Sequence, residues 1–316
     1  MSATEPAAAA GRSAWALPEL LGLRSDLDRL HELLGEWIET CDPEVRDMIR
    51  RQLSGRAKYF RPVTVFACHY ATTTKGLPRR VLEAAAGVEL IHNVSLIVDD
   101  ILDRSRYRRG ELSLHCRYGF LPGLMTAGYM GFGAPMLVAG DSYSVRLLAE
   151  LMQRLGAAEC LQWRLRRQPL GLEDWRAVAG EDTGSMFEIC AGLGCRDERL
   201  RRYGRLLGML YHGCDDVADV RGTMALGGGS EKDIIDGILT LPAAVALRDP
   251  ETAVLFRAAG PETFDEIALR LRAALPEAES YLDGLALEAE REACENAEYP
   301  ARLLELITHT RALSAA

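Results

Sequence analysis

Two aspartate-rich stretches with the same spacing constrain the fold of this chain more than any other feature. Residues 99–103 read DDILD and residues 215–219 read DDVAD. In each stretch the first and last aspartates are four residues apart, so on a helix the three carboxylates lie close together. Mg²⁺, which takes oxygen ligands from carboxylates and substrate phosphates, offsets the repulsion between them. Two such faces across a helical cavity would hold a diphosphate through bridging magnesium ions.

The segments before both stretches are too apolar for a solvated acidic face, the usual explanation of an isolated acidic run. Residues 88–98 read VELIHNVSLIV, and residues 206–214 read LLGMLYHGC. The sequence therefore predicts carboxylate clusters at the ends of two buried helices.

The rest of the chain also favours helices. Only 7% of the 316 residues are aromatic, and no stretch shows the sustained two-residue alternation of a strand. Pro-Glu pairs typical of helix starts recur along the chain. The predicted fold class is all-α. The expected helices cover residues 20–40, 62–72, 82–104, 134–155 and 199–220, and others begin at Asp42-Pro43, Glu173, Pro250, Pro261 and Pro276.

One domain is the simplest organisation, because the sequence has no short repeat and no long low-complexity linker. Residues 1–17 are rich in Ala and are expected to form a disordered tail, with one helical domain over residues 18–316. Residues 119–133 are expected to form a loop-rich connection, and 227–229 a flexible loop. The uncharged run 121–140 contains two prolines and several glycines, so it predicts a buried helix hairpin rather than an integral membrane span.

Charge and cysteine content narrow the class of protein further. The net charge of −9 argues against nucleic acid as a partner. Eight cysteines form no CxxC pair and no Cys/His ligand set, so reduced thiols and a cytoplasmic location are expected.

Basic residues accompany the first acidic stretch. Arg108 and Arg109 follow it closely, and Lys58 and Arg61 lie upstream. Arg presents a planar fork to phosphate oxygens, and Lys adds a compact charge. A catalyst that binds two diphosphates needs metal-binding carboxylates for the one that leaves and metal-free cations for the one that stays. The sequence supplies both.

On these residues the chain resembles the trans-isoprenyl diphosphate synthase (polyprenyl synthetase) family. Residues 57–62 match the family pattern GKxxRP, with Ala57 in place of its glycine. Residues 89–115 match the first aspartate-rich region and residues 215–219 the second. Three shorter matches are Gly140-Asp141 (GD), Gln162 (GQ) and residues 240–242 (TLP).

The resemblance implies an isoprenoid-synthase bundle of antiparallel helices around a central cavity, usually a homodimer. It also implies Mg²⁺-dependent condensation of isopentenyl diphosphate with an allylic diphosphate. The diphosphate group of the allylic substrate would leave, the double bond of isopentenyl diphosphate would attack the resulting carbocation, and a proton would then be lost. The residues expected to hold Mg²⁺ and, through it, the allylic diphosphate are Asp99, Asp100, Asp103, Asp215, Asp216 and Asp219, assisted by Arg108. Those expected to bind isopentenyl diphosphate are Lys58, Arg61, His92 and Arg109, while Thr183 and His212 are further substrate-binding candidates.

Three positions depart from the family pattern. Asp182 stands where the family has the lysine of KTG, Ile238 replaces a lysine two positions before TLP, and residues 211–212 read YH instead of FQ. The allylic site is therefore expected to have lost two positive charges. Each missing charge-assisted contact is worth about 1.5–3 kcal/mol, which is roughly ten- to a hundredfold in binding or rate. Lys232 is the nearest alternative cation in the sequence.

Two other functions compete with chain elongation. A type I terpene cyclase would not need the isopentenyl diphosphate site, and it often carries an NSE-type second motif instead of DDxxD. A weakly active partner subunit of a synthase would be expected to lose metal-binding aspartates first. The ranking is therefore synthase, cyclase, partner subunit.

Product length follows from two residues on the helix that carries the first motif. In the family, the positions four and five before that motif form the floor of the tunnel. They are Ser95 and Val94 here, and neither is aromatic. A small floor predicts a product of C20 or longer.

Overall fold

A computed structural model describes residues 17–54, 59–108, 110–222 and 230–315. The chain divides into two compact units. Unit 1 comprises Met1–Met152 and Ile189–Glu198, and unit 2 comprises Gln153–Glu188 and Arg199–Ala316. The single domain expected over residues 18–316 stays a prediction. The expected tail lies outside the described residues except for Leu17, as does the expected loop at 227–229.

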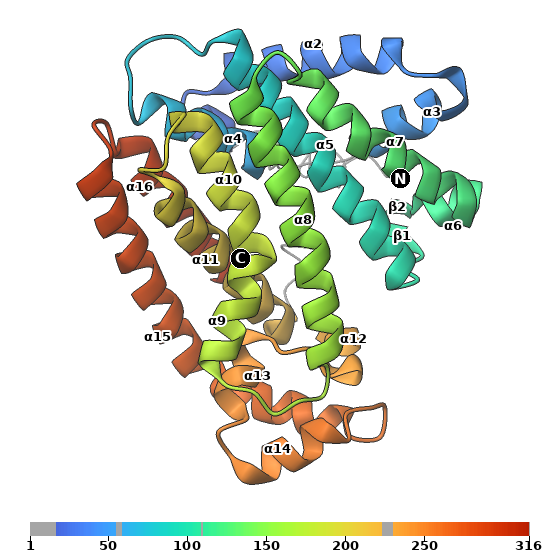
Figure 1. Ribbon diagram of the computed structural model, residues 1–316. Coiled ribbons are helices and arrows are strands. Elements are labelled where there is room, and N and C mark those ends of the chain that lie inside the picture. Colours follow the sequence, from blue (N-terminus) through green and yellow to red (C-terminus); the bar gives the residue numbers. More distant parts are fainter. Residues whose placement is uncertain (1–16, 55–58, 109, 223–229, 316) are drawn as a thin grey trace, which may run out of the picture. The chain divides into compact units, whose positions relative to one another are not determined.

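Unit 1 is built around α5 (Arg79–Leu102), which packs against α2, α4 and α7 (Figure 1). A run of small residues before the first motif lets neighbouring helices approach α5 closely. A Cβ at Gly87 would lie 2.6 Å from Leu148 Cδ1, well inside van der Waals contact. The bounds of the other elements of the unit are α2 (Arg24–Thr40), α3 (Pro43–Leu53), α4 (Phe60–Tyr70), β1 (Tyr107–Arg108), β2 (Glu111–Leu112), α6 (Leu114–Tyr118) and α7 (Phe120–Leu137).

Unit 2 is built around α11 (Arg201–Arg221), which packs against α15, α9, α16 and α13. Gly213 allows the close packing on α15, because a Cβ there would lie 2.6 Å from Leu282 Cδ2. Gly208 allows a close approach to α10, since its Cβ would lie 2.7 Å from the Thr183 carbonyl oxygen. The other elements are α9 (Leu172–Glu181), α12 (Ser230–Asp236), α13 (Leu241–Ala246), α14 (Pro250–Arg257), α15 (Phe264–Asn296), α16 (Ala301–Ala312) and the 3₁₀ helix η1 (Leu313–Ala315). Two helices, α8 (Ser142–Leu165) and α10 (Thr183–Cys195), contribute residues to both units.

The predicted all-α class is confirmed, because the only strands in the described part of the chain are the two-residue pair β1 and β2. Several helix starts are confirmed with their caps. The Asp42 side chain accepts a hydrogen bond from Glu44 N ahead of α3, and Asp249 accepts one from Thr252 N ahead of α14. Both acidic stretches end buried helices as predicted, with Asp103 at the C-cap of α5.

The expected loop at 119–133 and the expected buried hairpin over 121–140 are both wrong. A single helix, α7, covers Phe120–Leu137, and α8 begins at Ser142 rather than near residue 134. One face of α7 is also exposed: the exposed fractions are 63% for Leu121, 78% for Phe132 and 73% for Met136. A helix that is apolar all round gives no amphipathic pattern, and its glycines resemble turn signals.

The helix start expected at Pro276 is also wrong, because Pro276 lies inside the 33-residue helix α15. A proline there frees the carbonyl of the residue four positions earlier. Both Pro276 and Arg272 are exposed, so water can bond that carbonyl and the helix continues.

One described helix, α5, is long and apolar enough to cross a membrane. Within the structure, 72% of its most apolar window is buried. Such burial is typical of the core helix of a folded domain.

Candidate active site

The first aspartate cluster lies at the C-terminal end of α5 in unit 1. Asp100 is buried, and its Oδ1 accepts from Arg108 Nε at 2.9 Å and lies 2.7 Å from Nη2 of the same guanidinium. Burial raises the pKa of Asp100, and Arg108 opposes this rise. Asp99 and Asp103 are half-buried on either side. Arg108 of β1 therefore neutralises the central carboxylate of the motif.

The predicted isopentenyl diphosphate residues form a pair on neighbouring helices. Arg61 Nη1 of α4 lies 3.1 Å from His92 Nε2 of α5, and His92 is buried. The structure thus brings these two predicted residues together. Lys58 and Arg109 lie outside the described residues.

A cavity of about 450 Å³ adjoins the hairpin of unit 1. Its polar lining includes Arg51, Gln52, Arg108 and Ser113. Glu111 also lines the cavity and pairs with Arg51, while Arg108 pairs with Asp100, so the charges of both arginines are balanced by carboxylates.

The two chain-length candidates lie on α5, one turn or more before the motif. Val94 and Ser95 are half-buried, and Ser95 Oγ donates to the His92 carbonyl at 2.8 Å. A Cβ at Gly131 of α7 would lie 4.0 Å from Val94 Cγ2. Val94 therefore faces a position of α7 that has no side chain.

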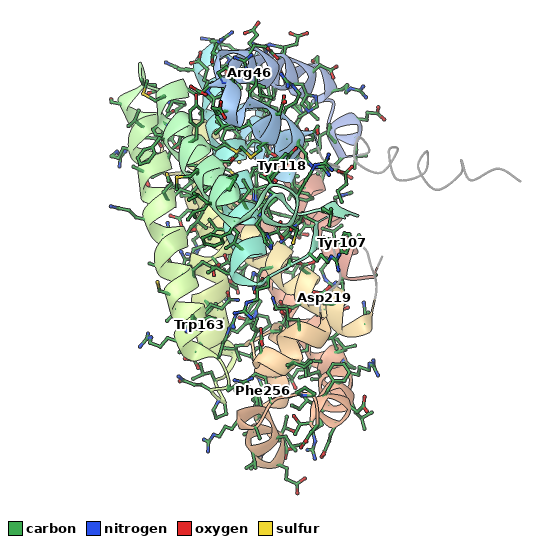
Figure 2. All side chains as sticks on the ribbon, turned by 90° about the vertical axis from the view of Figure 1, so that its right-hand side faces the viewer. Arg46, Tyr107, Tyr118, Trp163, Asp219 and Phe256 are labelled. Atoms are coloured by element: carbon green, nitrogen blue, oxygen red, sulfur yellow. The ribbon has the colours of Figure 1, made fainter. Side chains whose placement is uncertain are left out.

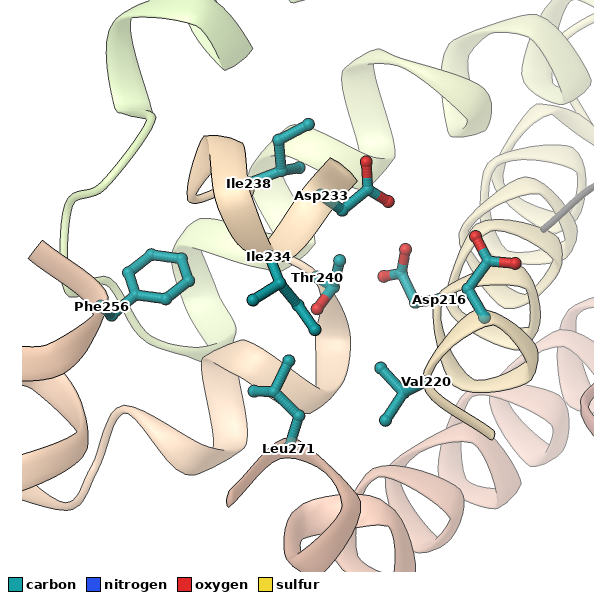
Figure 3. A pocket seen from close by; sticks show the side chains of 9 residues that line it. Asp216, Val220, Asp233, Ile234, Ile238, Thr240, Phe256 and Leu271 are labelled. Atoms are coloured by element: carbon teal, nitrogen blue, oxygen red, sulfur yellow. The ribbon is translucent and has the colours of Figure 1, made fainter. Parts of the chain in front are cut away.

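The second aspartate cluster lies near the end of α11 in unit 2. Asp216, Asp219 and Asp233 of α12 line one cavity of about 10 Å³, with room for about one water molecule. Figure 3 shows the carboxylates on one side of this cavity and Ile234, Phe256 and Leu271 on the other. Ile238, at the position of a family lysine, lines the same cavity.

Asp219 has a strongly raised pKa in this cluster. Burial, together with Asp215, Asp233 and Asp216, raises its pKa to about 7. Its Oδ1 is buried and has no hydrogen-bond partner among the residues that the structure describes. Asp219 lies on α11 (Figure 2). Its buried carboxylate oxygen is surrounded by the like charges of Asp215, Asp216 and Asp233. Such an oxygen is what a divalent cation requires.

Asp216 is held by neutral donors. Its Oδ2 accepts from Trp175 Nε1 at 2.9 Å and from Leu241 N at 2.8 Å. Burial raises the pKa of Asp216, while His212 and these two donors oppose the rise.

Asp182 and His212, two residues that differ from the family pattern, contact each other. His212 Nδ1 lies 3.3 Å from Asp182 Oδ2 and 2.9 Å from Thr183 Oγ1. Burial lowers the pKa of His212, but Asp216, Asp182 and Asp215 outweigh burial and raise it to about 9. His212 is therefore protonated at neutral pH and balances the charge of Asp182. Thr183 and His212, predicted separately, belong to one hydrogen-bonded group.

The acidic residues fit a magnesium ion that is shared with a ligand. Among the residues that the structure describes, no three His, Cys, Asp or Glu side chains are arranged to hold a metal by themselves. Mg²⁺ at phosphate sites typically takes only one or two carboxylates, with water and phosphate oxygens completing its shell. The orphaned oxygen of Asp219 suits that mode of binding.

Sequence reasoning missed three groups in this site: Trp175, Asp233 and the backbone N–H of Leu241. Asp233 lies in the segment 231–236, which reads EKDIID and has no metal-motif spacing. Trp175 lies far from residue 216 in the sequence, and an indole donor has no motif. The TLP match at 240–242 is the one signal that could have drawn attention to Leu241.

Comparison with known proteins decides the family. The family model described as "Polyprenyl synthetase" matches residues 42–270. The chain belongs to the polyprenyl synthetase family. It is 30% identical to geranylgeranyl pyrophosphate synthase 3 of Arabidopsis thaliana, over 67% of this chain and 66% of that protein. It is 26% identical to nonaprenyl diphosphate synthase of Mycobacterium tuberculosis, over 72% of this chain and 71% of that protein. Geranylgeranyl pyrophosphate synthase 4 of Arabidopsis thaliana is 27% identical over 71% of this chain, which spans 66% of that relative.

Solved structures of the family share the fold. Heptaprenyl diphosphate synthase from Staphylococcus aureus superposes with a TM-score of 0.83 at 19% identity, covering 93% of this chain and 98% of that one. A polyprenyl synthase from Caulobacter crescentus, complexed with calcium and isoprenyl diphosphate, gives 0.82 at 22% identity, covering 96% and 98%. The isoprenoid-synthase helical fold implied by the sequence resemblance is thus confirmed.

Proposed function

We propose that this polyprenyl synthetase family member is a Mg²⁺-dependent trans-prenyltransferase. It condenses isopentenyl diphosphate with an allylic diphosphate to give a trans-prenyl diphosphate of C20 or longer. The observation that carries the proposal is the buried, donor-free oxygen of Asp219 inside a cluster of like charges. The names of the relatives, geranylgeranyl and nonaprenyl diphosphate synthases, support the same reaction class.

Each group of residues has a task in this reaction. Mg²⁺, when bound, supplies the positive charge that stabilises the departing diphosphate. The aspartates of each motif would hold that charge in place. Arg61 and His92 bind the diphosphate that stays, together with Lys58 and Arg109. Apolar side chains around Val94 exclude water from the reacting carbons, which protects a carbocation from quenching.

The test is incubation with Mg²⁺, isopentenyl diphosphate and each allylic diphosphate in turn, followed by chromatography before and after phosphatase treatment. Prenyl alcohols that appear only after phosphatase support the proposal. Hydrocarbon formed without isopentenyl diphosphate would identify a cyclase. If the protein forms no product by itself but stimulates a second synthase on mixing, it would be identified as a partner subunit.

The protein is also proposed to act as a homodimer through α7. An exposed apolar stripe runs along this helix and consists of Leu121, Met125, Phe132 and Met136. Residues 119–140 contain no charged side chain. A second copy offers the same neutral surface, as a twofold interface requires. Phe132→Asp should convert the dimer into a monomer in light scattering, and an unchanged mass would contradict this interface.

We also propose a cytoplasmic location, because the cysteines of the chain, all of which the structure describes, form no disulfide. All eight thiols are free, and five of them are buried. Free thiols are typical of a reducing compartment. Fractionation of the native host tests this location.

A further inference from the structure

Trp175 of α9 is a large core side chain whose only polar atom is directed at the second motif. The residue is completely buried, and its Nε1 donates to Asp216 Oδ2 at 2.9 Å. Tyr281 of α15 meets its ring edge-on at a centroid distance of 5.7 Å. A Cβ at Gly213 would lie 3.1 Å from Trp175 Cζ2, so α11 approaches the indole closely. The ring is fixed by packing, and its donor is therefore fixed as well.

A second donor reaches the same oxygen. Leu241 N, at the start of α13, donates to Asp216 Oδ2 at 2.8 Å. A carboxylate oxygen has about two lone-pair sites, so these two donors use the capacity of Oδ2. The other oxygen, Oδ1, lies 3.8 Å from His212 Nε2, which is longer than a hydrogen bond but within the range of an ion pair.

We infer that Trp175 is a positioning residue that, with Leu241 N–H, fixes the orientation of Asp216 and leaves Oδ1 as its oxygen for a divalent cation. This inference rests on the proposed function, because it assigns Trp175 a task toward the metal that the reaction needs. A carboxylate held in this way presents one oxygen instead of two and loses no side-chain freedom when the ion binds.

If Trp175 had a purely structural role, its replacement would have a different effect on metal affinity. If the indole only fills the core, its replacement changes stability and leaves metal affinity alone. The acceptor here is an ionisable member of the DDVAD motif. Loss of the N–H would therefore change metal binding even where folding is preserved.

The decisive variant is Trp175→Phe, with Trp163→Phe as the matched control. Trp163 of α8 is 67% exposed and stacks with Arg166 at 4.3 Å from the ring centre. Mn²⁺ binding is measured by electron paramagnetic resonance of the free ion, with inorganic pyrophosphate present and no prenyl substrate. Trp175→Phe should weaken Mn²⁺ affinity about 10–100-fold, the usual effect of removing a hydrogen bond to a metal ligand. Trp163→Phe should stay within about twofold of wild type by the same reasoning. Wild-type affinity in Trp175→Phe would overturn the inference.

A double-mutant cycle separates positioning from packing. In an Asp216→Asn background, Trp175→Phe should have no further effect on Mn²⁺ affinity, because the oxygen that it orients no longer carries charge. An equal loss in both backgrounds would assign Trp175 a general structural role and overturn the inference.

Wild-type protein gives an independent readout if the variant does not fold. With ¹⁵N-labelled tryptophan, the indole N–H resonance of Trp175 should shift during a Mg²⁺ and pyrophosphate titration while that of Trp163 stays in place. A Trp175 resonance that does not respond would contradict the inference. Protein that binds Mn²⁺ but forms no product would refute the proposed function alone, whereas protein that binds no Mn²⁺ would refute both.

Discussion

At the end of α5, Arg108 donates to Asp100 and neutralises the centre of the first motif. Near the end of α11, Asp216 accepts hydrogen bonds from two neutral donors and lies beside the protonated His212, which balances its charge without a hydrogen bond. Asp219 is left with a buried oxygen that has no donor and with a pKa of about 7. The five-residue spacing is the same in both motifs. The four-residue separation of the first and last aspartates determines the positions of the carboxylates on the helix. The neighbouring side chains determine whether the carboxylates are charged. The second motif therefore depends more strongly on a cation.

The largest expected effect tests whether both motifs serve one reaction. Asp99→Ala and Asp215→Ala should each lower kcat/KM by about 10³-fold or more, because several kcal/mol of charge stabilisation are lost. The variant that combines them should be little worse than either one, since the residues act as a unit. The control is Glu295→Ala on an exposed position of α15. Full turnover in either single variant would show that its motif binds no catalytic metal.

The next comparison sets Asp100→Asn against Asp219→Asn in urea unfolding with EDTA at pH 8. Asp100→Asn should change the free energy of unfolding by less than about 1 kcal/mol, because Arg108 loses its charged partner while the cost of burying the Asp100 charge is removed. Asp219→Asn should stabilise it, because a carboxylate that resists ionisation is removed. Destabilisation of similar size in both variants would contradict the contrast between the motifs.

The pH dependence of Asp219 has a definite sign. Its pKa is about 7 in the folded state and 3.8 ordinarily, so between these values the folded state holds a proton that the unfolded state has lost. This group therefore makes the protein less stable as pH rises from about 4 to about 7. Asp219→Asn should remove this contribution to the slope of unfolding free energy against pH. An unchanged slope would show that Asp219 has an ordinary pKa.

A smaller effect is expected at the Asp182–His212 pair. Asp182→Lys combined with His212→Gln restores the residues that the family carries, and it should lower KM for the allylic diphosphate about tenfold. Asp182→Lys alone should gain less, since the new lysine would stand beside a protonated His212. Equal gains in the single and double variants would show that His212 carries no charge.

The smallest expected change concerns product length rather than rate. Val94→Phe should place an aromatic ring beside Gly131 of α7, where the Met152 side chain also packs at 3.2 Å from a Cβ built on Gly131, and so shorten the product. Chromatography of the dephosphorylated products measures chain length. An unchanged product would show that the tunnel floor lies elsewhere.

Most helices could be predicted from apolar spacing and proline–acid pairs, because these patterns report local preferences. The exceptions have physical causes. The helix α7 is apolar all round and rich in glycine, so no face distinguishes it from a buried hairpin. Pro276 has the sequence context of a helix start, but α15 continues through it at an exposed position.

The residues of the candidate site also fall into those that the sequence could identify and those that it could not. The six aspartates and the pair of Arg61 and His92 could be identified, because each belongs to a motif with a recognisable spacing. Trp175 could not, since only the folded chain brings α9 to α11. The charge balance between Asp182 and His212 could not be predicted, because only the packing of α10 on α11 brings positions 182 and 212 together.

The contact between Gly184 of α10 and Gly208 of α11 restricts how this protein can be altered. A Cβ at Gly208 would lie 2.8 Å from Gly184 Cα, so the two backbones touch. His212 lies one helical turn beyond Gly208 and bonds Thr183 at 2.9 Å. Even alanine at 208 would push the helices apart and pull that bond open. Libraries or chimaeras made from related enzymes should therefore exchange the segments around 184 and 208 together, as one cassette.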